Sequence, residues 1–199
     1  MSSSAAVSAS ETTESPRRTL SPRQAATVDG LVDAAVIELR AGGYGALTVR
    51  NVARRAGVAP ATAYTYFASK EHLVAEVYWR RFRAQSDPDT TAGTTVQRAA
   101  AALASFALVV ADEADLSAAC TVAVLADDAD VKLLRERIGG ELNRRLVLAL
   151  GPSARPEILA TLQFAVSGAL LQVGTGHLSY ADLPDVLDAI AFTVLGSDT

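Results

Sequence analysis

The sequence predicts an all-α protein of about nine helices. Half of the 199 residues are hydrophobic but only 6% are aromatic, so the core must consist mostly of Ala, Leu and Val. Ala and Leu favour helices, and the glycines and prolines are few and clustered. Apolar residues recur at helical spacing, and no run alternates with a period of two for long enough to form a strand.

The first helix begins at the stretch LSPRQ. Ser21 takes the N-cap position, Pro22 the first helical position, and Gln24 the position that completes a capping box. Apolar residues then follow at helical spacing, and two glycines at 42–43 end the helix.

Two short helices come next. Thr48 caps a helix over 49–56, and Gly57 breaks it. Pro60 suits the first turn of a third helix, which ends near Tyr66. Two short helices joined by a glycine-containing turn are typical of a helix-turn-helix, whose later helix lies in the major groove of DNA.

The rest of the chain is also helical. Ser69 caps a fourth helix over 70–85, and a polar linker over 86–95 follows. Later helical patterns cover 96–112, 115–126, 129–150, 156–175 and 183–195. We expect a disordered tail over 1–20, a helix-turn-helix DNA-binding domain over 21–68, a connecting helix over 69–85, and a helical-bundle ligand-binding and dimerisation domain over 96–196.

Composition excludes several classes of protein. The single cysteine, Cys120, rules out an internal disulfide, and with only two histidines we expect no metal and no other cofactor. The N-terminus has no apolar segment of the kind that a secretory signal needs. We expect no run to reach the roughly 18 uncharged apolar residues of a membrane span, and therefore expect a cytoplasmic protein that does not contact a membrane.

The charge is distributed unevenly. Residues 17–83 carry a net charge of +6 and residues 84–199 a net charge of −8, within an overall −4. A basic segment joined to an acidic body is typical of a nucleic-acid reader on a solubilising domain. Arg17, Arg18 and Arg23 form either a flexible tail or an arm that reaches the minor groove.

The third helix carries residues suited to DNA. Ala61 is small enough for close approach, and Thr62 can reach a base edge or a thymine methyl. Tyr64 and Tyr66 offer hydroxyl groups to phosphate oxygens, and Lys70 opens the next helix, where its charge attracts phosphate. The candidate DNA contacts are Thr48, Arg50, Ala61, Thr62, Tyr64, Tyr66 and Lys70.

The stretch GYGALTVRNVARRAGVAPATAYTYFASKEHL, residues 43–73, resembles the DNA-binding signature of the TetR family of bacterial transcription repressors. It departs from the family pattern at Ala63, where a larger apolar residue is usual, and at Pro60 and Ala61. The resemblance implies a homodimer that binds a palindromic operator and releases it when a small molecule enters the C-terminal domain. It also implies DNA contacts by Thr48, Arg50, Thr62, Tyr64, Tyr66 and Lys70.

The C-terminal helices have small side chains that permit either a close-packed core or a ligand cavity. Their few polar residues favour an apolar or amphipathic effector, such as a lipid-like or acyl compound. The candidate lining residues are Phe106, Val110, Cys120, Val124, Ile138, Leu142, Gln163, Phe164 and Ser167.

The last two helices are apolar on more than one face, which fits a four-helix dimer interface. The main functional hypothesis is therefore a homodimeric, effector-released repressor. An effector-independent regulator or activator is the first alternative, and a helical-bundle enzyme is the second. The enzyme is disfavoured because the sequence contains no nucleophile beside a base and no glycine-rich phosphate loop.

Overall fold

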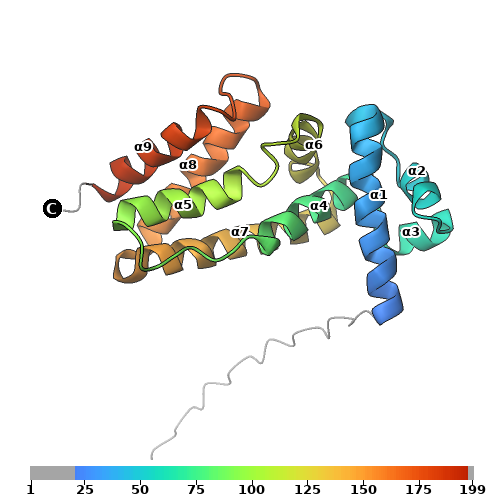
Figure 1. Ribbon diagram of the computed structural model, residues 1–199, viewed down its shortest axis with the longest axis horizontal. Coiled ribbons are helices and arrows are strands. Elements are labelled where there is room, and N and C mark those ends of the chain that lie inside the picture. Colours follow the sequence, from blue (N-terminus) through green and yellow to red (C-terminus); the bar gives the residue numbers. More distant parts are fainter. Residues whose placement is uncertain (1–20, 197–199) are drawn as a thin grey trace, which may run out of the picture.

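The computed structural model describes residues 21–196, and within this range the chain forms nine α-helices, one short 3₁₀-helix and no strand (Figure 1). The helices are α1 (Pro22–Ala46), α2 (Val49–Arg55), α3 (Pro60–Tyr66), α4 (Lys70–Ala84), α5 (Thr95–Ala107), α6 (Ala114–Val124), α7 (Ala129–Leu150), α8 (Pro156–Gly174) and α9 (Leu183–Leu195), with the 3₁₀-helix at Gly151–Ser153. The predicted all-α class is confirmed. The tail expected over 1–20, with Arg17 and Arg18, lies outside the described residues.

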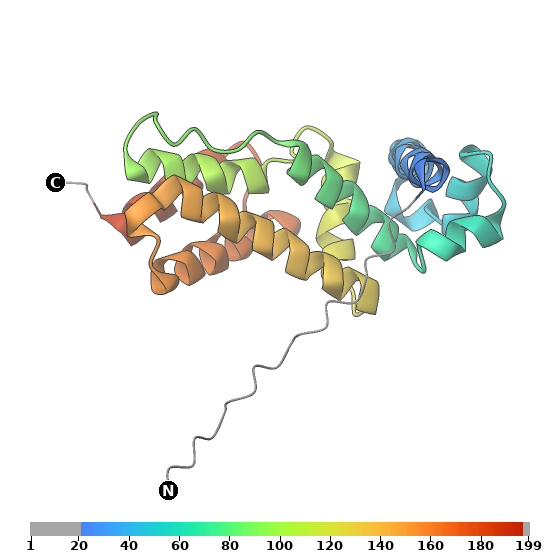
Figure 2. The same ribbon diagram turned by 90° about the horizontal axis from the view of Figure 1, so that it is seen from below.

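The helices form two groups joined by α4. Helices α1, α2 and α3 lie together at one end, and α5, α7, α8 and α9 form a bundle at the other (Figures 1 and 2). Helix α4 packs against both α1 and α7. Helix α6 lies between the groups, where it packs against α1, α4 and α8. Any movement of α6 would therefore displace its contacts with both groups.

The caps that the sequence indicates are present. Ser21 and Gln24 form a capping box on α1, while Thr48 and Ser69 accept hydrogen bonds from the backbone of α2 and α4. Helix α1 runs on to Ala46, beyond the expected end, because the backbone kinks at Gly43 (φ 67°) and then resumes.

Helix α5 ends at Ala107, five residues earlier than the pattern over 96–112 predicts. Side chains of other helices bind one carbonyl oxygen in its last turn and one in the turn that follows it. The hydroxyl of Tyr78 donates to the carbonyl of Phe106 over 2.8 Å, and the hydroxyl of Ser117 donates to that of Val110. These tertiary bonds stabilise a turn in place of further helix.

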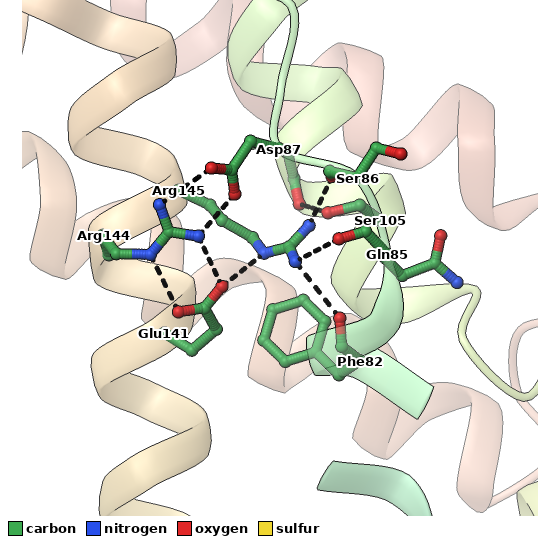
Figure 3. A network of polar contacts seen from close by, with 9 residues as sticks. Phe82, Gln85, Ser86, Asp87, Ser105, Glu141, Arg144 and Arg145 are labelled. Atoms are coloured by element: carbon green, nitrogen blue, oxygen red, sulfur yellow. Dashed lines mark hydrogen bonds and ion pairs between the residues drawn. The ribbon is translucent and has the colours of Figure 1, made fainter. Parts of the chain in front are cut away.

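A buried arginine joins α7 to the end of α4 (Figure 3). The side chain of Arg145 is 1% exposed, and its guanidinium donates to the backbone carbonyls of Phe82, Gln85 and Ser86 over 2.8–3.2 Å. It also pairs with Glu141 at 2.9 Å. The last carbonyls of a helix lack partners within it, so this arginine holds the C-terminus of α4 against the bundle.

Helix α8 corrects one expectation. By length and composition alone it is long and apolar enough to cross a membrane, contrary to the expectation that no run of the chain is. In the folded chain α8 packs against α9, α7 and α6 as part of the bundle.

Candidate nucleic-acid interface and ligand cavity

The turn between α2 and α3 is built by one glycine and a small buried contact. Gly57 has φ 70°, a conformation that residues with a Cβ rarely adopt. The amide of Val58 donates to the carbonyl of Ala53 over 3.0 Å, which closes the turn. Ala63, on the inner face of α3, is completely buried, and its small side chain lets α3 lie close to the neighbouring helices.

Helix α3 has one exposed face. Ala61, Thr62 and Tyr64 all lie on it, and 51% of Tyr64 is exposed. Tyr66, two residues on, is half-buried and packs against the core. The two tyrosines therefore differ: Tyr64 is free to contact another molecule, whereas Tyr66 also supports the fold.

The other three candidates lie at the starts of α2 and α4. Thr48 and Arg50 are both exposed, and the Thr48 hydroxyl accepts the amide hydrogen of Asn51 at 3.1 Å. Lys70 is half-buried, with its ammonium 3.2 Å from the Tyr44 carbonyl and 4.1 Å from the centre of the Tyr44 ring. This tether fixes the position of the Lys70 charge.

Ion pairs neutralise much of the basic excess that the sequence shows. Arg55 binds Glu38 at 2.5 Å, and Arg80 binds Asp29 and Glu76. Arg50 and Arg54, by contrast, are exposed and form no ion pair within the described part of the chain. Within residues 21–196, unpaired positive charge thus lies on α2, which packs against α3, as it also does at the exposed Arg23 of α1 and Arg83 of α4.

Glu113 links three helices at the junction between the two groups. It is the N-cap residue of α6, and its carboxylate binds Arg40 of α1 at 2.7 Å and Arg81 of α4 at 2.6 Å. Its side chain is 16% exposed. The hydrogen bond from Arg40, supported by Arg81, holds the pKa of Glu113 below its ordinary value of 4.5.

A Glu113→Gln variant is expected to lose about 1 kcal/mol of stability at pH 7. Because the folded-state pKa is lowered, the carboxylate stabilises the fold above pH 4.5 and this contribution is lost as the pH falls further. The difference from wild type should therefore shrink in acid, which urea unfolding at pH 7 and pH ~3 measures. Glu136→Gln, at an exposed position of α7, is the control; an equal effect there would contradict the role of Glu113.

The helical bundle contains a cavity of about 500 Å³. Eight of the nine residues predicted to line a pocket do line it: Phe106, Val110, Cys120, Val124, Ile138, Leu142, Gln163 and Ser167. Phe164 does not, because it points away from the cavity on α8 and is 78% exposed. A helix that is apolar on several faces does not reveal which face turns inward, and this explains the error.

Several residues of the cavity wall were not among those predicted. Tyr78 and Tyr180 lie outside the helices that the predicted lining residues come from, and Arg135 adds a charge to the wall. The place of Arg135 on the cavity face could have been predicted from the sequence. It precedes Ile138 and Leu142 by three and seven residues, which is the spacing of one helix face.

Cys120 lies in the cavity wall as a neutral thiol. It is 4% exposed, and burial raises its pKa to about 12. Since the thiolate is the reactive form, this environment favours a packing role over redox sensing.

An exposed helix after a glycine turn, unpaired cations beside it, and a separate bundle with a cavity together define a DNA-binding regulator of the helix-turn-helix class. Residues 31–77 match the family model of bacterial regulatory proteins of the tetR family. The chain is 45% identical over 175 residues to an HTH-type transcriptional regulator of Mycobacterium tuberculosis, covering 87% of this chain and 82% of that one. The chain belongs to the TetR family of transcriptional regulators.

Other matches cover a shorter part of the chain or show its fold. The HTH-type transcriptional repressor KstR of M. tuberculosis is 41% identical over 68 residues, 33% of this chain and 31% of that one. A TetR regulator from Rhodococcus sp. RHA1 shares the fold with a TM-score of 0.73 at 19% identity, covering 90% of this chain and 100% of that one. FadR of Bacillus subtilis, solved in complex with stearoyl-CoA, has a TM-score of 0.59 at 14% identity and covers 86% of this chain and 99% of its own.

Proposed function

We propose that this chain is a homodimeric repressor that binds a palindromic operator through α2 and α3 and releases it when a small apolar or amphipathic molecule enters the cavity. The observation that carries the DNA-binding part is the exposed face of α3, where Thr62 and Tyr64 project while Ala63 and Phe67 are buried. A recognition helix needs this division between a buried supporting face and an exposed reading face.

Within this proposal the seven candidate residues have different roles. Ala61 allows close approach, Thr62 contacts a base edge, and Tyr64 contacts the phosphate backbone. Thr48, Arg50, Tyr66 and Lys70 also contact the backbone. We assign residues 21–68 to DNA binding, 69–85 to the connection, and 96–196 to the effector and the dimer interface. Arg23 is exposed in the first turn of α1, where an N-terminal arm would start.

The dimer part of the proposal is supported by exposed apolar side chains on α8 and α9. Phe164 is 78% exposed, Leu171 51% and Phe192 57%. Neighbouring apolar residues of this size are usually covered by another protein surface. Two helices from each subunit would then form a four-helix interface, with a two-fold axis matching the symmetry of a palindrome.

A Phe164→Asp variant is expected to weaken dimerisation by at least about tenfold, since it places a charge within an apolar interface. Sedimentation equilibrium over a range of concentrations measures this. Glu157→Gln, at an exposed site on the same helix, is the control. A dimer of unchanged strength in Phe164→Asp would place the interface elsewhere.

The release part of the proposal rests on α6. Its inner face lines the cavity through Cys120 and Val124, and its N-terminus is bound by Glu113 to α1 and α4. A molecule that displaces α6 would therefore shift the two recognition helices of a dimer relative to each other. Release also requires that the effector bind the two conformations with different affinities.

The test is binding of the purified protein to DNA from upstream of its own gene and to a pool of genomic fragments, at several salt concentrations. We expect tight binding to a palindromic site that weakens steeply with salt. Binding no stronger than to random duplex across the whole pool would reject the proposal. If a site is found but no compound lowers the affinity for it, the effector-independent regulator is favoured instead.

A further inference from the structure

We propose that the cavity binds an anionic amphiphile, whose carboxylate pairs with Arg135 while its apolar body lies among the remaining wall residues. This inference rests on the proposed function insofar as the cavity is the effector site. It narrows the effector from any apolar or amphipathic compound to one that carries a single negative head group.

Arg135 faces the cavity because of its place on α7. Helix α7 lines the cavity with Arg135 and with the residues three, four and seven positions after it, which are Ile138, Gly139 and Leu142. Arg135 is half-buried, whereas Ile138 and Leu142 are 5% and 3% exposed. The charged group therefore lies toward the open side of the cavity, with an apolar interior behind it.

Arg135 is the only charged residue among the 19 that line the cavity. No carboxylate lies within ion-pair distance of it anywhere in residues 21–196. A positive charge beside an apolar volume attracts a negative ligand and repels a positive one, and the attraction is stronger there than in water.

The guanidinium is fixed in place but retains free donors. Its Nη1 donates to the carbonyls of Val124 and Ala126, both at 2.8 Å, which caps the end of α6. A guanidinium has five N–H groups, and in the described chain the Nε and Nη2 groups of Arg135 donate to no protein acceptor. A carboxylate is the group that best fits such paired donors.

Most of the polar side chains around the cavity already donate to the protein. The hydroxyls of Ser117, Thr121 and Ser167 donate to backbone carbonyls, as does that of Tyr78, and the Gln163 amide donates to Asn143. The Tyr180 hydroxyl makes no hydrogen bond to a described residue and adds one neutral donor. The wall thus offers one strong anion site and little for a sugar-like ligand.

The experiment compares dodecanoate with dodecanol, which share an apolar chain and differ in the head group. Each displaces the neutral fluorophore N-phenylnaphthylamine from delipidated full-length protein, with no DNA present. We expect dodecanoate to bind wild type about tenfold or more tightly than dodecanol, as a charge-assisted hydrogen-bonded pair would require. Equal binding of the two, or no binding of either, would overturn the inference.

Three variants locate the effect. Arg135→Gln should lose the preference for dodecanoate while binding dodecanol within about threefold of wild type. Arg137→Gln, an exposed arginine of α7 outside the cavity wall, should keep the preference. If Arg135→Gln binds neither ligand, Arg135→Lys decides, because it keeps the charge: retained preference supports the inference and lost preference rejects it.

The outcome can be separated from that of the proposed function. If dodecanoate binds through Arg135 but does not release operator DNA, the ligand class stands and the release mechanism fails. If the protein binds no operator at all, the regulator proposal fails while the displacement result still decides the ligand class.

Discussion

Replacing Tyr64 with alanine is expected to lower operator affinity by about thirtyfold or more without unfolding the protein. A lost backbone contact costs about 1–2 kcal/mol, and a dimer that binds two half-sites loses it twice. The ring is half-exposed on α3 and contributes little to the core, so the free energy of unfolding should change by less than about 0.5 kcal/mol.

Binding to the selected operator by fluorescence anisotropy and urea unfolding of the same preparation measure the two effects separately. Tyr64→Phe keeps the ring and removes the hydroxyl, so it separates phosphate hydrogen bonding from ring contact. Tyr66→Ala is a weaker probe, because Tyr66 packs against the core and its loss affects stability as well as binding. If Tyr64→Ala bound the operator as tightly as wild type, the proposal that this face of α3 contacts DNA would be rejected.

Replacing Arg145 with alanine is expected to cost about 3–5 kcal/mol of stability, a large share of the total for a protein of this size. The side chain is 1% exposed, and its removal leaves the carbonyls of Phe82, Gln85 and Ser86 without their donor. It also leaves the Glu141 carboxylate without a buried partner and removes a guanidinium 4.7 Å from the centre of the Phe82 ring.

Arg144→Ala is the matched control, since Arg144 is the neighbouring arginine on α7 and also pairs with Glu141 (Figure 3). Its side chain is 45% exposed, so we expect its loss to cost about 1 kcal/mol or less. Urea unfolding of the three proteins at pH 7 measures both changes. Equal losses of stability in the two variants would show that burial does not determine how much Arg145 stabilises the fold.

The same network bears on function through α4. Arg145 fixes the C-terminus of α4 to the bundle, while Ser69 at its N-terminus donates to Asp128 at the start of α7 over 2.7 Å. Both ends of α4 are thus bound to α7. In the proposed mechanism α4 would be a second route, beside α6, by which a change in the bundle reaches α1.

Much of the fold could be predicted from the sequence because its signals are local. The capping box of Ser21 and Gln24 and the caps of Thr48 and Ser69 join residues three apart, and such contacts depend little on the rest of the protein. The same holds for the turn at Gly57. The cavity residues were predictable for a related reason, since apolar positions at helical spacing share a face.

Tertiary structure decided which face and which charge mattered. Phe164 and Val166 lie on one apolar helix, yet the first is 78% exposed and the second fully buried, and only the packing of α8 distinguishes them. Arg40 and Glu113 are 73 residues apart, so their pairing, and the charge that it removes from the DNA-binding end, depends on how α1 meets α6. The helices and the helix-turn-helix could be predicted without the structure, because their signals come from neighbours along the chain. The absence of a carboxylate partner for Arg135 in residues 21–196, and the buried link from Arg145 to α4, required the fold, because only the packing of the helices decides which groups meet.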